Sequence, residues 1–176
     1  PSYADQSILN IPATVCKLLG IPGIGAGELN PNITAALGTD IQRVIVILMD
    51  GLALHRFQNW LKNAPVWNTL IKEGVLAPLT SVVPSTTSSA LTTLWTGCSP
   101  AQHGIIGYEM FTKEFSMISN MILHAPMTFS NDIGGLERAG FAAEEFLPVP
   151  TFGPHLKAHG LTPYGFMHYS IANSGL

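Results

Sequence analysis

The chain has 176 residues, about the size of one ordinary domain. Hydrophobic residues make up 47% of it and charged residues only 11%, against about 25% charged in a typical soluble domain. This composition excludes an intrinsically disordered chain. The formal net charge of −3 gives no electrostatic basis for binding a nucleic-acid polymer.

The sequence predicts a soluble domain and leaves its compartment open. The longest unbroken aliphatic run, Val44 to Met49, is far shorter than the roughly 18 apolar residues that a membrane-spanning helix needs. No signal-peptide pattern is present at the start of the sequence. A membrane span is therefore not expected.

Residues 1–40 are interpreted as a lead-in, and residues 41–176 as the N-terminal part of a larger domain. An amphipathic helix is predicted at 7–19, followed by the glycine-rich stretch 20–27. This stretch is similar to a phosphate-binding loop, but no strand precedes it and no good helix follows, so it is interpreted as a connection. Cys16 and Cys98 have no metal-binding spacing and are expected to be buried thiols.

Strands and helices alternate in the prediction for residues 41–176. This alternation indicates an α/β fold with a mostly parallel sheet. The predicted strands are residues 43–49, 75–83 and 164–171, with a hairpin or antiparallel strand within 111–123. The predicted helices are residues 52–60, 66–73, 88–96 and 154–159.

Hydroxyl side chains are concentrated in a part of the sequence that has no charge. Residues 75–108 contain no Asp, Glu, Lys or Arg, and residues 80–96 contain ten Ser and Thr. Capping and local back-bonding would account for some of these hydroxyls. Several of them, however, fall at a strand-to-helix turn, residues 84–89, where free N–H groups favour an anion or its attacking nucleophile.

Asp50 is a second candidate functional residue. It directly follows the most apolar predicted strand, and sites in open α/β sheets form at the carboxyl ends of strands. An acidic side chain in this position is well placed to bind a metal ion or to contribute to a phosphate site. The alternative is that Asp50-Gly51 only forms a turn, or that Asp50 caps the next helix.

The order of these motifs resembles a known enzyme family. The motifs are VIVILMDG at 44–51, PSTTSSALTTLWTG at 84–97 and SPAQHGIIGY at 99–108. Together they are similar to the opening of the type I phosphodiesterase/nucleotide pyrophosphatase branch of the alkaline phosphatase superfamily. The resemblance is clearest over residues 43–108. It implies an alkaline-phosphatase-like three-layer sandwich with a mostly parallel central sheet.

The resemblance also implies roles for single residues. Asp50 matches the first metal-binding aspartate, and Thr87 matches the threonine nucleophile, which also contacts a metal. Thr86 is the near alternative, and His103 matches a structural histidine that is not a ligand. Tyr108 stands where nucleotide pyrophosphatases carry an asparagine, so contact with the phosphoryl oxygen falls to Tyr108 or to N–H groups at the helix start.

The implied function is metal-dependent hydrolysis of phosphodiester or nucleotide pyrophosphate bonds through a phosphothreonine intermediate. The implied cofactors are two divalent ions, with zinc as the family's usual metal, and such a site needs more ligands than Asp50 and Thr87. His155 and His159 have a ligand-compatible spacing but are interpreted as part of a surface helix. His55, His124, His168 and Asp132 are not expected to be ligands.

The shortage of ligands leads to the expectation that the chain is the N-terminal part of a longer enzyme. Alone, it would then be inactive or nearly so. A missing C-terminal segment or a homo-oligomer would complete it. The alternatives are a phosphomonoesterase or phosphomutase of the same superfamily, or a truncated module that binds phosphate or a partner without catalysis. A sulfatase is disfavoured because residues 87–91 lack the proline and arginine of the sulfatase motif.

Overall fold

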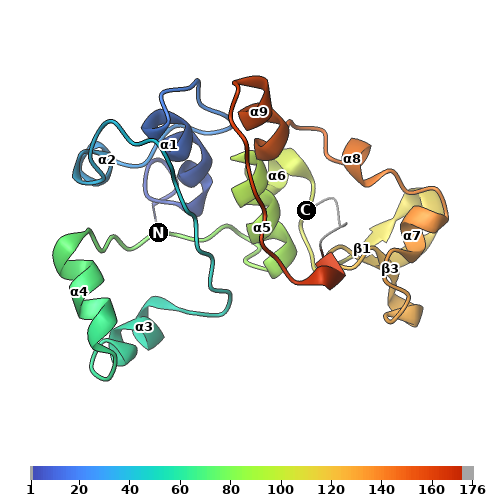
Figure 1. Ribbon diagram of the computed structural model, residues 1–176. Helices are drawn as coiled ribbons and strands as arrows, with labels where there is room; N and C mark the ends of the chain where they lie inside the picture. The colour runs from blue at the N-terminus through green and yellow to red at the C-terminus, as the bar shows by residue number, and fades with distance from the viewer. Residues whose placement is uncertain (1, 172–176) are drawn as a thin grey trace.

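The computed structural model describes residues 2–171, and residues 172–176 of the expected domain lie outside this range. It combines helices with a small antiparallel sheet of strand order β1-β2-β3 (Figure 1). The strands are β1 (Glu109–Thr112), β2 (Met117–Asn120) and β3 (Ala125–Pro126). The α-helices are α1 (Ile11–Leu18), α2 (Pro31–Ala36), α3 (Leu54–Trp60), α4 (Pro65–Glu73), α5 (Thr87–Thr96), α6 (Pro100–His103), α7 (Gly135–Arg138), α8 (Ala143–Phe146) and α9 (Phe152–Ala158). The 3₁₀ helices are η1 (Ile8–Asn10), η2 (Lys113–Phe115), η3 (Met127–Phe129) and η4 (Tyr169–Ile171).

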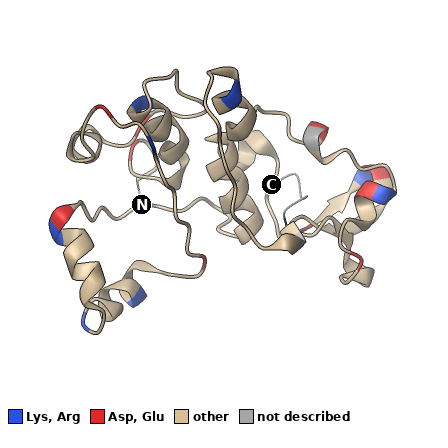
Figure 2. Cartoon of the chain, viewed as in Figure 1, with Lys and Arg blue, Asp and Glu red and all other residues tan. Residues whose placement is uncertain are grey.

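Helix α5 lies at the centre of the packed part of the molecule. It contacts η1, α1, α6 and α9, and Figure 1 shows it between the N-terminal helices and the segment that leads to the sheet. Figure 2 shows that Lys, Arg, Asp and Glu lie on the surrounding elements and that α5 and α6 carry none. The charge-free stretch of the sequence is therefore the central helix and its neighbour.

Local sequence signals explain where α5 begins and ends. Thr86 is the N-cap, and its hydroxyl accepts a hydrogen bond from the Ser89 N–H at 3.3 Å. Such a side-chain cap satisfies one of the unpaired N–H groups of the first turn. The helix ends at Gly97, whose left-handed conformation (φ 67°) closes the last turn.

The glycine-rich stretch 20–27 packs against the end of α5 and is a connection, as predicted. The Ala26 N–H donates to the Gly97 carbonyl at 2.7 Å. Gly25 has φ +69°, and a Cβ placed there would lie 2.3 Å from the Gly97 oxygen. The close approach of the two backbones therefore requires glycine at position 25.

Replacing Gly25 with alanine is expected to lower the free energy of unfolding by more than about 2 kcal/mol. The left-handed backbone alone costs roughly 1–2 kcal/mol for a residue with a Cβ, and the contact with Gly97 adds to it. Gly20→Ala is the matched control, because Gly20 has φ +70° and nothing within 4 Å of its Cβ position. Urea unfolding of both variants measures the difference, and equal losses would contradict the close approach.

The predicted helices and the hairpin are confirmed. Helices α1, α3, α4, α5 and α9 fall on the ranges that the sequence patterns predicted. Strands β1 and β2 pair antiparallel, with Glu109 opposite Asn120, as the alternation within residues 111–123 indicated. No helix among residues 2–171 is long and apolar enough to cross a membrane.

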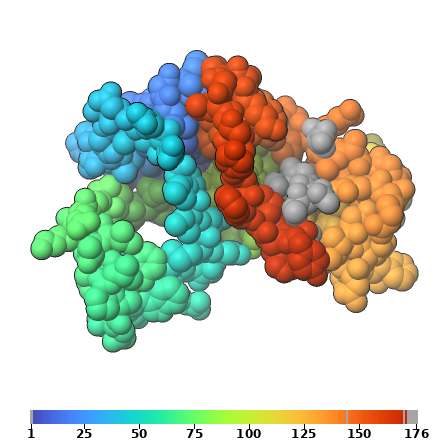
Figure 3. Space-filling view, in the orientation of Figure 1, coloured from blue at the N-terminus to red at the C-terminus, as the bar shows by residue number. Residues whose placement is uncertain are grey.

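The three predicted parallel strands are absent from the described residues, so the predicted mostly parallel sheet is not found there. Residues 43–49 form no regular secondary structure and no ladder, and Ile45 and Ile47 are 85% and 76% exposed. Residues 75–83 form only one isolated bridge, between Thr80 and Ser7, and residues 169–171 form η4. The pattern of β-branched residues predicted strands, but a strand needs a neighbour with which to form a ladder. Figure 3 shows residues 41–50 passing over the outside of the molecule.

Both cysteines are free and buried, as predicted. Burial raises the pKa of the Cys16 and Cys98 thiols, and a protonated, inaccessible thiol is a poor nucleophile. Neither is expected to react with a thiol reagent such as DTNB at pH 7.5 in the folded protein, and both are expected to react in denaturant. Rapid reaction of either thiol under native conditions would contradict this packing.

Candidate active site

Asp50 and Thr87 meet in the structure although 37 positions separate them. The Thr87 hydroxyl donates a hydrogen bond to Asp50 Oδ2, with 3.1 Å between the oxygens. The other carboxylate oxygen, Oδ1, accepts from the Gly51 N–H at 2.8 Å. Asp50 follows segment 43–49, and Thr87 is the first residue of α5. The contact therefore joins the two features that the sequence singled out separately.

The neighbouring hydroxyls of Thr86 and Thr87 have different surroundings. Thr86 Oγ1 accepts from the Ser89 N–H and also lies 3.0 Å from Ser88 Oγ and 3.2 Å from Ser89 Oγ. It is engaged within the first turn of α5, whereas the Thr87 hydroxyl points away from that turn to Asp50. This division of roles favours Thr87 over Thr86 as the reactive hydroxyl.

The start of α5 has backbone donors that the protein does not use. Among the described residues, the N–H groups of Thr87 and Ser88 have no hydrogen-bond partner. The Ser89 N–H is held by the cap. Free N–H groups at a helix start, together with the helix dipole, favour a negatively charged oxygen.

Two serines connect the first turn of α5 to the loop that follows α6. The Ser88 hydroxyl donates to the Gly107 carbonyl at 2.8 Å, and the Ser89 hydroxyl donates to the Ile105 carbonyl at 2.7 Å. Both serine side chains are completely buried. These bonds place residues 105–107 directly against the turn that begins with Thr87.

His103 connects the same loop to the middle of α5. Its Nδ1 accepts from the Ile105 N–H at 3.1 Å, and its Nε2 lies 3.1 Å from Thr93 Oγ1. Since Nδ1 is an acceptor, the neutral ring carries its proton on Nε2 and donates it to Thr93. Burial lowers the pKa of His103 to about 4, and a backbone hydrogen bond to Ser89 opposes part of that shift. The ring is therefore neutral at pH 7, in agreement with its expected structural role.

Tyr108 directly follows Gly107, whose carbonyl accepts a hydrogen bond from Ser88 in the first turn of α5. Its carbonyl accepts from the Met121 N–H at 2.9 Å, which connects it to the residue that follows the end of β2. Its side chain is exposed at the surface. The structure thus brings the Tyr108 backbone near the turn of Thr87, and it shows no contact between the Tyr108 side chain and Thr87 or Asp50.

Three of the other histidines have hydrogen-bond partners within the protein. His155 Nε2 lies 2.8 Å from the Pro22 carbonyl, and His159 Nδ1 lies 2.9 Å from the His155 carbonyl. The buried ring of His124 pairs through Nδ1 with Glu137 Oε1 at 3.1 Å. These contacts fit the interpretation of the histidines as structural side chains.

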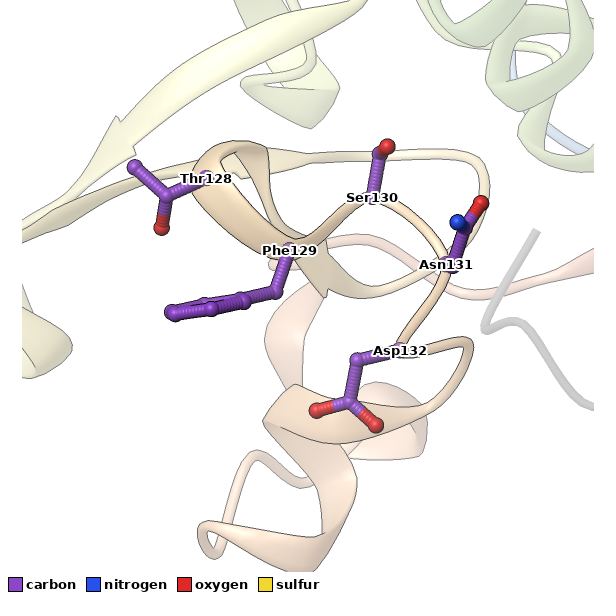
Figure 4. A pocket seen from close by; sticks show the side chains of 5 residues that line it. All are labelled: Thr128, Phe129, Ser130, Asn131 and Asp132. Atoms are coloured by element: carbon purple, nitrogen blue, oxygen red, sulfur yellow. The ribbon is translucent and has the colours of Figure 1, made fainter.

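Two hollows on the surface are lined by residues other than Asp50 and Thr87. One is lined by Thr128, Phe129, Ser130, Asn131 and Asp132. Figure 4 shows that Ser130 and Asn131 point to the opposite side from Phe129 and Asp132, so their polar atoms do not converge. Asp132 pairs with Arg138. A second hollow is apolar, lined by Leu52, Leu54, Phe57, Ala77, Pro78 and Leu79.

The ligands of a complete metal site are not assembled among residues 2–171. No group of three or more His, Cys, Asp or Glu side chains is placed there to hold an ion. Asp50 and Thr87 offer two oxygen atoms 3.1 Å apart. Oxygen donors of this kind suit zinc or another divalent ion, but a structural or catalytic zinc site uses three or four protein ligands. The pair therefore fits part of a ligand set.

Comparison with protein families identifies the segment that contains both residues. Residues 44–128 match the family described as type I phosphodiesterase / nucleotide pyrophosphatase. This match confirms the resemblance seen in the sequence. It covers just under half of the chain and includes Asp50, α5, His103 and Tyr108. The family indicates phosphate-ester hydrolysis as the type of chemistry. Searches of curated proteins and of solved structures found no match.

The hydrogen bonds of Ser88, Ser89 and Thr93 were not predicted from the sequence. The sequence signal was present as the dense run of hydroxyls in residues 80–96. What the sequence does not specify is the partner of each hydroxyl, because the loop carbonyls that accept from Ser88 and Ser89 lie 19 and 16 positions further along the chain.

Proposed function

We propose that this chain supplies the nucleophile and a metal ligand of a metal-dependent phosphate-ester hydrolase. The observation that supports it is the 3.1 Å hydrogen bond from the Thr87 hydroxyl to Asp50, inside the segment that matches the phosphodiesterase family. Phosphodiester and nucleotide pyrophosphate bonds are the proposed substrates. A small phosphate ester or nucleotide would be the natural ligand.

Thr87 Oγ1 is the proposed attacking atom. It forms a bond to phosphorus while the bond from phosphorus to the leaving oxygen breaks, and that oxygen takes up a proton. Water then hydrolyses the phosphothreonine and restores the hydroxyl. A threonine hydroxyl is a weak nucleophile unless its environment favours the deprotonated form. The Asp50 carboxylate accepts its hydrogen bond and orients Oγ1 away from the helix.

The start of α5 is the proposed binding place for the phosphoryl oxygens. The free N–H groups of Thr87 and Ser88 lie at the N-terminus of α5. The helix dipole favours negative charge at this terminus. Donors fixed in place before the reaction are effective in stabilising charge that develops in the transition state. Tyr108 is the proposed substrate-binding side chain at the exposed edge of this turn.

Two divalent ions, with zinc as the first choice, are the proposed cofactors. Asp50 and Thr87 would hold one of them, and a bound ion would supply positive charge that lowers the pKa of the hydroxyl. The other ligands would come from residues beyond those that the structure describes or from another copy of the chain. In that larger assembly, segments 43–49 and 75–83 would enter a mostly parallel, alkaline-phosphatase-like sheet over the domain that begins near residue 41.

Substitution of Asp50 with asparagine tests the proposal. In buffer with zinc, the chain is expected to hydrolyse bis-p-nitrophenyl phosphate slowly, and Asp50→Asn is expected to lower the rate by at least about 100-fold through loss of the charged acceptor. Asp40→Asn is the matched control, because Asp40 is an exposed carboxylate and asparagine also tolerates its positive φ of 57°. Equal rates for Asp50→Asn and Asp40→Asn would contradict the proposal.

The same assay separates the proposal from its alternatives. Faster hydrolysis of p-nitrophenyl phosphate than of the diester would favour a phosphomonoesterase. The absence of a complete ligand cluster among residues 2–171 favours the other alternative, a non-catalytic phosphate-binding module. Calorimetric binding of zinc and phosphate, with no turnover even when the segment or second copy that completes the ligand set is supplied, would support that module and overturn the enzyme assignment.

A further inference from the structure

We propose that Ser88, Ser89 and His103 form a positioning network that fixes the first turn of α5 against residues 105–107. Through that turn, the network would set the direction of the Thr87 hydroxyl, so the proposal rests on the proposed function of Thr87. None of the three residues contacts the Thr87 hydroxyl or Asp50. They would act on the reaction only through the backbone that they hold.

The two serines differ from the other buried hydroxyls of α5. Thr92 and Thr96 donate to carbonyls of their own helix, at Ser88 and Thr92, with distances of 2.8 and 2.7 Å. Such back-bonding satisfies a hydroxyl without joining the helix to anything else. Ser88 and Ser89 instead reach the carbonyls of Gly107 and Ile105. Their hydroxyls therefore hold two separate pieces of backbone together.

His103 extends this connection to the second turn of α5. It accepts from the Ile105 N–H and, through Nε2, bonds Thr93. Ile105 is thus held at both backbone groups, its N–H by His103 and its carbonyl by Ser89. The Ile105 side chain is almost completely buried. The loop cannot shift along the helix without breaking several buried hydrogen bonds, each of which would leave a polar group unsatisfied.

The network lies within a stretch of the chain that carries no charged side chain. Residues 75–108 contain no Asp, Glu, Lys or Arg, and no buried side-chain polar atom among the described residues lacks a hydrogen-bond partner. A fully satisfied buried network of this kind rigidifies the elements it joins. The network would hold the backbone of the turn that carries Thr87. The Thr87 hydroxyl is directed to Asp50, which is exposed at the surface.

Precision at this turn matters because displacement of a reacting group by about 1 Å can cost roughly 100-fold in rate. Ser89→Ala removes the bond to Ile105, so it is expected to lower kcat for bis-p-nitrophenyl phosphate by about 10–100-fold with little change in KM. Thr92→Val is the matched control, since it removes a buried hydroxyl of the same helix that bonds only within α5. Its kcat per folded molecule is expected to equal that of the wild type.

Amide hydrogen exchange gives a second measurement that does not depend on turnover. Ser89→Ala is expected to speed exchange at residues 105–108 selectively, while exchange in α1 stays as in the wild type. Thr92→Val is expected to leave exchange at residues 105–108 unchanged. Equal exchange at these residues in the two variants would overturn the positioning network, even if no turnover is detected.

The outcomes distinguish failure of the network from failure of the proposed function. Turnover that survives Thr87→Ala would overturn the proposed function, whereas the exchange data would still decide whether the network holds the loop. Loss of turnover in Thr87→Ala, combined with equal kcat values for Ser89→Ala and Thr92→Val, would overturn the positioning role alone.

Discussion

Replacing Thr87 with alanine is expected to reduce zinc-supported hydrolysis of bis-p-nitrophenyl phosphate by at least about 1000-fold, since removal of a nucleophile eliminates the covalent route. Thr86→Ala is the matched control one residue earlier. It removes the cap of α5 and is expected to cost about 1 kcal/mol of stability, while the folded protein is expected to keep far more turnover than Thr87→Ala, because Oγ1 of Thr87 is still present. Steady-state rates, corrected for the folded fraction by circular dichroism, measure both variants.

Comparison of Thr86→Ala with Thr87→Ala shows which of the two hydroxyls is the nucleophile. If Thr86→Ala abolished turnover and Thr87→Ala did not, the assignment of roles within the turn would be reversed. Thr87→Ser adds a further comparison, because serine keeps an oxygen that can donate to Asp50. It is expected to retain more activity than Thr87→Ala.

Lowering the pH from about 6.5 to about 4 is expected to remove about 3 kcal/mol of stability through His103 alone. Burial lowers the pKa of His103 in the folded protein to about 4, whereas an unfolded histidine titrates near 6.5. Between these values the unfolded state binds the proton more readily, so stability falls as the pH falls. Above about pH 6.5 both states are neutral, and this contribution to the pH dependence vanishes.

Urea unfolding of the wild type and of His103→Gln at several pH values between 7.5 and 4.5 measures this contribution. The carboxylates titrate in both proteins, so the difference between the two slopes isolates His103. His103→Gln is expected to be less stable at pH 7.5 and to lose less on acidification. Parallel pH profiles of the two proteins would contradict a buried, neutral His103.

Sequence patterns predicted the parts of the fold that depend on local interactions. Helix α5 was predicted because Gly97 can close it in a left-handed conformation and because its apolar and hydroxyl residues fit a buried helix. The hairpin of β1 and β2 was predicted from alternation within a short segment. In each case the residues that determine the structure lie within one turn or one hairpin of each other.

The predicted parallel strands were not found among the described residues, because strand pairing depends on residues far apart in the sequence. Residues 43–49 have the composition of a buried central strand, yet Ile45 and Ile47 are exposed in the structure. The β-branched side chains favour extended backbone at this position, but burial depends on neighbouring strands that the described residues do not supply. Composition thus predicted a strand whose pairing partners are absent from the described residues.

The candidate site shows the same division. The meeting of Asp50 and Thr87 was expected only because the motifs resembled those of a family, since nothing local relates positions 50 and 87. The hydrogen bonds of Ser88 and Ser89 to the 105–107 backbone were missed, because a run of hydroxyls does not specify which distant carbonyl each one meets. The sequence therefore indicated which residues carry the candidate chemistry, but it did not indicate the hydrogen-bond partner of each hydroxyl.

Trapping of the covalent intermediate tests the central claim most directly. The chain would be incubated with zinc and a p-nitrophenyl phosphate ester, quenched in acid and analysed by peptide mass spectrometry. We predict a phosphoryl or phosphoryl-ester group on Thr87, absent in Thr87→Ala and present in Thr86→Ala. A modification on Thr86 or Ser85, or continued turnover with Thr87 unmodified and dispensable, would contradict the account.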